Sequence, residues 1–350
     1  MYALQSSIEN KNKNFEDTFI SHVHVHDRYY DTAVKNKYYS QSITFKGQRK
    51  MVLNNKTSLG FGGDYNYNKG DFQVKGNWGS SAKGHSDNLG LFSNLGYDLN
   101  DTTIISAHLR GDSHKYSEEN LTYRLNLSKL INDFTLNLTE STGLRYPDLY
   151  VLHGENPSGS FKPMNTTKPE KSRTREVSIK YNLSDNTFFE TTAYKGSVSD
   201  VLNRGTSTFG YNEVIDIKQE GLENNFVLKG KKQSLTLSSA LTKSREGNGS
   251  PQLRRPEKQF NMKYSKDFQT KMFGTLNFNY DYRHIGKVED WKNGTFRAKV
   301  DSSDIMNLSF SKKFSGNTLS INVFNLTDEI YQRPDTYNQE GRRIGLSFRS

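Results

Sequence analysis

The segment 275–282, TLNFNYDY, decides how this chain folds. Drawn as an extended strand, it places four apolar or aromatic residues on one face: Leu276, Phe278, Tyr280 and Tyr282. The opposite face carries three polar residues: Asn277, Asn279 and Asp281. Three amide or carboxylate groups cannot all be buried in an apolar core at tolerable cost, so this face must meet water. The other face must meet apolar surroundings, which predicts a strand between two different environments.

The same period of two recurs along the chain, whereas no segment shows a comparable helical period. It is found in the segments 59–67, 122–127, 134–139, 176–181, 319–323 and 344–348. Two further segments, 186–203 and 210–229, are predicted as strands much longer than those of ordinary sheets. The sequence therefore predicts an all-β protein.

Short and long connections alternate between these strands. Tight turns rich in Asn, Asp and Gly are predicted at 53–55, 99–101, 131–133, 184–186, 230–232, 266–268 and 315–317. Longer polar connections are predicted at 30–37, 68–88, 112–118, 144–170, 203–209, 245–255, 284–300 and 327–340. The alternation is typical of a transmembrane antiparallel β-barrel, with short periplasmic turns and long extracellular loops. It gives about 16 strands.

Composition agrees with a barrel and excludes several other classes. Mean hydropathy is only -0.84, yet 12% of the residues are aromatic, as expected where half of each strand faces water and aromatic girdles line the interfaces. Without cysteine, disulfides, thiolate metal sites and cysteine nucleophiles are excluded. The net charge is +10, but the Lys and Arg residues are spread along the chain and mixed with Asp and Glu. They form no nucleic-acid-binding motif.

The N-terminal residues 1–14 are polar and lack the basic and apolar regions of a signal peptide. We therefore expect a polar lead-in at 1–14 and one β-barrel domain at 15–350.

Four segments together resemble TonB-dependent outer-membrane receptors. The C-terminal sequence LSINVFNLTDEIYQ, followed by YNQEGRRIGLSF, resembles the last two strands of that family. The motif Pro169-Glu170-Lys171-Ser172 matches the family's Pro-Glu-Lys-Ser motif, and Gly221-Leu222-Glu223 matches a Gly-aliphatic-Glu motif. The segment 253–264, LRRPEKQFNMKY, resembles a paired-arginine motif and favours the cobalamin-receptor branch, although siderophore receptors share much of the pattern.

This resemblance implies uptake of a scarce nutrient, a corrinoid or a ferric siderophore, across the outer membrane of a Gram-negative cell. The expected partners are outer-membrane lipid and a TonB-type energy-coupling protein. Family barrels have about 22 strands around a plug. This sequence has no counterpart of the family's signal peptide, TonB-binding box and plug, or of about six strands. We therefore expect the C-terminal portion of such a barrel.

The long connections are the predicted ligand surface. Aromatic rings beside cationic or polar groups suit a bulky amphipathic ligand. The candidate ligand-binding residues are Arg145, Tyr146, Tyr150, His153 and Trp291. Each of them also fits a simpler role in loop packing or interfacial anchoring.

The sequence predicts no resident metal, cofactor or catalytic group. His22, His24 and His26 share one strand face. They are more simply interpreted as polar residues facing the lumen than as a metal site. Asp87, Asp112 and Asp290 are too scattered to indicate calcium binding, and Glu118-Glu119 and Glu289-Asp290 fit solvated loops. No nucleophile elbow, P-loop or zinc-protease motif is present, so an enzyme is not expected.

Two alternatives remain open from the sequence. A passive porin of about 16 strands would enclose an aqueous channel, with 144–170 as its constriction loop. A soluble β-sandwich would bury the apolar face between two sheets, but the long predicted strands disfavour it.

Overall fold

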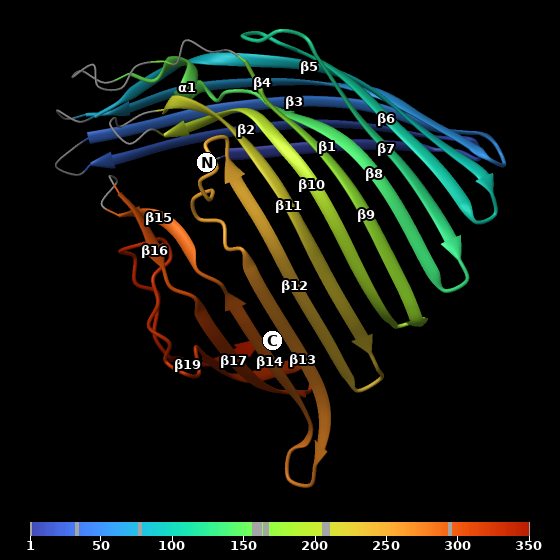
Figure 1. The fold of residues 1–350 in the computed structure, drawn as a ribbon, viewed down its shortest axis with the longest axis vertical. Helices are drawn as coiled ribbons and strands as arrows, with labels where there is room; N and C mark the ends of the chain where they lie inside the picture. Colours follow the sequence, from blue (N-terminus) through green and yellow to red (C-terminus); the bar gives the residue numbers. More distant parts are fainter. Residues whose placement is uncertain are drawn as a thin grey trace. The chain divides into compact units, whose positions relative to one another are not determined.

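The computed structural model describes residues 2–31, 35–75, 79–155, 163, 168–204, 211–292 and 296–349. Its main sheet has 17 strands within these ranges, and β15 with β16 form a separate two-stranded sheet. Figure 1 shows the long strands and the short helix α1. None of the helices among the described residues combines the length and apolar character required to cross a membrane.

The chain divides into two compact units. The first contains Met1–Lys129, Leu138–Arg175 and Ser197–Asp216, and the second contains Leu130–Asn137, Glu176–Gly196 and Ile217–Ser350. The strands β1 to β7 lie in the first unit, apart from the end of β7: β1 Tyr2–Lys11, β2 Phe15–Asp31, β3 Lys35–Asn54, β4 Thr57–Val74, β5 Ser81–Asn100, β6 Thr103–His114 and β7 Asn120–Ile131. The strands that contribute residues to both units are β8 Phe134–Arg145, β9 Glu170–Ser184, β10 Thr187–Arg204 and β11 Tyr211–Lys229. The first unit also holds α1, Leu149–His153.

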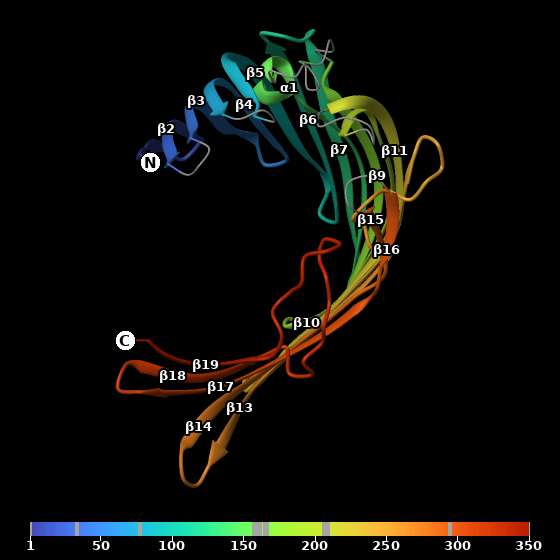
Figure 2. The same ribbon diagram turned by 90° about the vertical axis from the view of Figure 1, so that its left-hand side faces the viewer.

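The remaining strands belong to the second unit: β12 Gln233–Glu246, β13 Lys258–Thr270, β14 Gly274–Ile285, β15 Val288–Lys292, β16 Phe296–Val300, β17 Ser303–Phe314, β18 Asn317–Phe324 and β19 Arg343–Arg349. Within each unit the strand pairings are antiparallel and join strands that follow one another along the sheet, from β1 to β7 and from β11 to β19. Figure 2 shows β17, β18 and β19 side by side.

The register gives each sheet face a predominant character, as the alternation predicts. In the second unit, Asn279 pairs with Ser265 and Ser309, whereas Tyr280 pairs with Tyr264 and Leu308. We call the two sides the polar face and the apolar face. Many large side chains of the apolar face are exposed, including Leu91 at 63% and Leu121 at 66%. Such a face has no protein layer against it in these regions.

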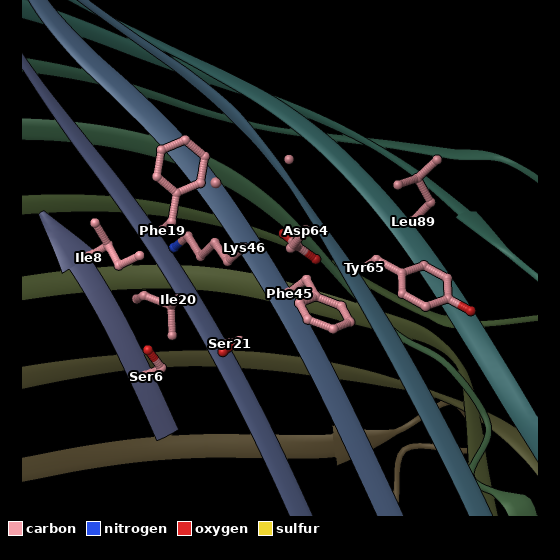
Figure 3. Close-up of a pocket in the computed structure, with 12 residues that line it drawn as sticks. Ser6, Ile8, Phe19, Ile20, Ser21, Phe45, Lys46, Asp64, Tyr65 and Leu89 are labelled. Carbon is pink, nitrogen blue, oxygen red and sulfur yellow. The ribbon is translucent and has the colours of Figure 1, made fainter. Parts of the chain in front are cut away.

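A hollow interrupts the apolar face of the first unit. Gly47 and Gly63 are cross-strand partners on β3 and β4, and the absence of side chains there leaves a cavity of about 500 Å³. Figure 3 shows Phe19, Phe45 and Tyr65 on neighbouring strands around it.

The polar face of the first unit is joined by ion pairs across strands. Arg110 of β6 contacts Asp64 of β4 through Nη1 at 2.6 Å and Asp112 through Nη2 at 2.7 Å. The guanidinium reaches Asp64 across Gly90 of β5, where a Cβ atom would lie 2.0 Å from Nη2. Asn88 also donates to Asp112. This network connects three strands and satisfies carboxylates that are nearly buried, at 12% and 4% side-chain exposure.

Two parts of the predicted strand pattern differ from the structure. The turn predicted at 266–268 is wrong, because β13 continues to Thr270, and the Thr270 hydroxyl accepts from Phe273 N and donates to Gly274 O around the turn. The connection predicted at 68–88 is mostly strand, since β4 and β5 remain paired as far as Gln73 and Ser81. Ladder hydrogen bonds join backbones and do not require apolar side chains, so polar strand ends look like loops in a sequence.

The N-terminal region also differs from the prediction. The sequence predicts a lead-in at 1–14, but Tyr2–Lys11 form β1, which pairs with β2 along its whole length. Asn12 forms the turn, its side chain accepting hydrogen bonds from the amides of Asn14 and Phe15. The predicted connections at 30–37 and 203–209 lie partly outside the described residues.

We expect Arg110→Leu to lower the free energy of unfolding by about 2 kcal/mol, because Asp64 and Asp112 would lose their shared cation while remaining 12% and 4% exposed. The measurement is chemical denaturation of the folded chain followed by circular dichroism. Lys11→Met is the control, since its pair with Glu16 is 3.9 Å long and exposed. Equal effects of the two substitutions would contradict a stabilising role for the Arg110 network.

Candidate functional site

The candidate site lies in the first unit, where α1 packs on the polar face of β4 and β5. Asp148 caps the helix, accepting a hydrogen bond from Val151 N at 2.9 Å, and Val151 is buried at 3% exposure. An isolated bridge between Ser81 and Glu155 fixes the chain after the helix. The helix is therefore held at both ends.

Glycines on the sheet make this packing possible. A Cβ atom at Gly84 would lie 2.2 Å from Cδ2 of His153, and one at Gly70 would lie 3.3 Å from Cδ1 of Leu149. Gly70 and Gly84 are cross-strand partners in the register of β4 and β5. Side chains at both positions would push α1 away from the sheet.

Aromatic and histidine rings gather beside the helix. His114, at the end of β6, stacks on Tyr146 with centroids 4.1 Å apart and an interplanar angle of 9°. Tyr116 lies edge-on to His153 at 5.3 Å. Tyr150 donates to the hydroxyl of Ser80 at 2.8 Å. These residues come from three connecting segments, so the cluster is a property of the fold.

The structure brings together three of the five predicted ligand residues: Tyr146, Tyr150 and His153. Arg145 lies at the end of β8 with its side chain 69% exposed, in a 3.5 Å contact with Glu170. The backbone of Trp291 belongs to β15, and its side chain lies outside the described residues. Sequence reasoning missed His114, Tyr116 and Gly84. The first two lie in the predicted connection 112–118, where a histidine two residues before a tyrosine is the available signal.

Burial shapes the protonation of the cluster. Burial lowers the pKa of His153, and electrostatic interactions with Lys115 and His85 lower it further. Its Nε2 atom is buried without a hydrogen-bond partner in the part of the chain that the structure describes. Burial also raises the pKa of the Tyr146 phenol. Both rings are therefore neutral at pH 7, which suits contact with a ligand that has apolar surface.

The other sequence candidates have structural partners. His22, His24 and His26 lie on the polar face opposite Thr44, Ser42 and Ser40, with adjacent ring centroids 6.3 Å and 6.4 Å apart. Asp112 contacts Arg110, and the buried Asp290 contacts Arg254 Nε at 2.7 Å. No group of three or more His, Asp or Glu within the described ranges is arranged to hold a metal ion.

A second cluster of ion pairs lies in the second unit, over connections of the sheet. Arg297 contacts Glu246 at 2.6 Å and Glu289 at 3.3 Å. Arg333 donates to the carbonyls of Ile285, Gly286 and Asp301. The connection predicted at 284–300 thus contains the β15–β16 hairpin, tied to its neighbours by charged side chains.

Comparison with known proteins identifies a family for most of the chain. A family model described as "TonB dependent receptor-like, beta-barrel" matches residues 2–326. Comparison with curated proteins gives no match.

Three solved structures illustrate the likeness of fold. The FrpB iron transporter of Neisseria meningitidis (F3-3 variant) has a TM-score of 0.79 at 13% identity, covering 99% of this chain and 62% of that one. The ferric yersiniabactin uptake receptor of Yersinia pestis has a TM-score of 0.76 at 12% identity, covering 99% and 59%. The ferric-catecholate import receptor of E. coli K12 has a TM-score of 0.78 at 11% identity, covering 99% and 63%. The chain thus spans about three-fifths of these proteins' length, and at such identities the likeness is one of fold.

We expect α1 to be held less firmly at acidic pH. Because the fold lowers the pKa of His153, the undocked state binds a proton more readily, and docking weakens as pH falls through the ordinary value of about 6.5. Hydrogen exchange of the Ser81 and Glu155 amides, expressed as protection factors, should show less protection at pH 5.5 than at pH 7.5. His153→Gln removes the titrating group and should abolish the difference. A pH dependence that persists in this variant would contradict the assignment.

Proposed function

Because the chain belongs to the family of TonB-dependent receptor-like β-barrels, we propose that it forms the ligand-binding barrel of an outer-membrane importer in a Gram-negative cell. Family membership across residues 2–326 carries the proposal. The cargo that we propose is a ferric siderophore, with a corrinoid as the second candidate. The family is one of receptors and transporters, which supports a binding function over an enzymatic one.

The ring cluster around α1 is the proposed ligand contact. Neutral aromatic and imidazole rings offer apolar surface, and the exposed guanidinium of Arg145 offers a charge for an anionic group on the chelate. Two structural neighbours are named for the uptake of ferric compounds, which supports an iron chelate over cobalamin as the cargo. In this proposal a TonB-type coupling protein supplies energy to the full-length receptor through its plug.

A passive porin is the alternative that this proposal replaces. Family membership across residues 2–326 does not support a porin. A porin would pass small solutes without energy, so energy dependence separates the two functions.

The proposed function is tested by uptake in cells that lack their own ferric-chelate receptors and express the native, full-length protein. We expect accumulation of radioactive iron from at least one chelate in a siderophore panel, and loss of it when the membrane is de-energised. Tyr146→Ala and Tyr150→Ala should weaken binding by roughly tenfold through loss of ring contacts. Tyr97→Ala, on the apolar face near a turn, is the matched control. Uptake of cobalamin alone would select the corrinoid, and energy-independent uptake would support a pore.

Membrane insertion is tested by substituting two adjacent residues of β18 that point to opposite faces of the sheet. Ile321 is 50% exposed and pairs with Phe310 and Leu346 on the apolar face, whereas Ser320 pairs with Ser311 and Ser347 on the polar face. If the apolar face contacts lipid, Ile321→Arg should destabilise the folded chain in bilayers by about 2–4 kcal/mol, and Ser320→Arg by less than about 1. Reversible unfolding from lipid vesicles measures both. Equal, small effects would mean that Ile321 faces water.

A further inference from the structure

A cationic patch interrupts the apolar face of the first unit at the loop end of β9. Lys171, Arg173 and Arg175 occupy alternate positions, so they share one face of the strand, and their side chains are 47%, 53% and 66% exposed. Alternation places Tyr123 of β7 and Glu140 of β8 on the apolar face as well, and both contact this patch. The neighbouring exposed residues on this face of β7 are leucines.

Glu140 is shared by two guanidiniums. Arg173 Nη2 lies 2.5 Å from Oε1, and Arg175 Nε lies 2.7 Å from Oε2. Tyr123 donates to Oε1 at 2.6 Å and holds the carboxylate in place. Lys171 contacts Glu118 at 3.0 Å. One carboxylate between two arginines leaves a positive charge uncompensated, and both arginine side chains are more than half exposed.

The surroundings indicate what kind of anion would bind. Leu121, Leu125 and Leu138 are 66%, 51% and 39% exposed on the same face of β7 and β8. Guanidinium groups bind phosphate through paired hydrogen bonds, and tyrosine is favoured where apolar and aqueous environments meet. A phosphate group attached to acyl chains matches both the cations and the leucines, whereas a free anion would use only the cations.

We propose that Arg173 and Arg175, with Lys171 and Tyr123, bind the phosphorylated headgroup of an outer-leaflet lipid whose acyl chains lie along Leu121, Leu125 and Leu138. This site rests on the proposed membrane location and lies on the sheet face opposite the ring cluster of α1. Glu140 then has two roles: it orients the guanidiniums, and it limits affinity by neutralising one of them.

The test uses the full chain in neutral maltoside micelles, with thermal unfolding followed as lipid is added. The probes are lipid A, which carries two phosphates, phosphatidylcholine, and inorganic phosphate. We expect lipid A to raise the unfolding midpoint in a saturable way, with little effect of the other two. The variant Arg173→Gln with Arg175→Gln should bind lipid A roughly tenfold more weakly.

Two further variants separate lipid binding from a structural role. Glu140→Gln removes the competing carboxylate, so it should bind lipid A more tightly even if it lowers stability. Lys180→Gln with Lys263→Gln removes the same number of charges from the polar face and should leave lipid A binding unchanged.

Three outcomes would overturn the site: equal stabilisation by lipid A and phosphatidylcholine, equal stabilisation by inorganic phosphate, or weaker lipid A binding by Glu140→Gln. The Ile321→Arg and Ser320→Arg pair reports on membrane insertion separately. If that pair shows lipid contact but lipid A stabilises the chain no more than phosphatidylcholine does, only the proposed lipid site is contradicted. If it shows no lipid contact, the proposed function fails first.

Discussion

The antiparallel backbone ladder is the constraint on which the rest of this structure depends. Successive residues of a strand must point to opposite faces, so the register that satisfies the backbone also decides the surroundings of every side chain. In the first unit this places Asp64, Asn88, Arg110 and Asp112 on one face, where they contact one another across strands. A shift by one residue would move these charges to the side that carries Leu89, Leu91 and Leu109.

Two charge clusters of the first unit have opposite compositions. On the polar face, one guanidinium, Arg110, lies between the carboxylates of Asp64 and Asp112. On the apolar face, one carboxylate, Glu140, lies between the guanidiniums of Arg173 and Arg175. The first arrangement leaves one carboxylate in excess over the guanidinium, and the second leaves one guanidinium in excess among exposed leucines. This contrast gives the cationic patch a role different from that of the polar network.

Glycine permits two close approaches of side chains to β5 in the first unit. Gly90 leaves room for Arg110 to cross β5, and Gly84 leaves room for the ring of His153 against the same strand. The first approach ties strands together, and the second seats α1 and the rings beside it. A connecting segment is thereby packed against the sheet surface.

The sequence by itself determined the class of fold and the two faces, because a period of two is a local property that survives without knowledge of any partner strand. It also indicated most of the turns, the long strands β10 and β11, and the family, through short motifs such as 169–172. It did not indicate β1 or the turn at 271–273, where polar strand residues look like loop and an apolar turn looks like strand. Only the tertiary structure decided which residues meet: His114 with Tyr146, Gly84 with His153, and Glu140 with Arg173 and Arg175. These contacts join strands or connections many residues apart, and cross-strand register, which brings them together, is set by the whole sheet.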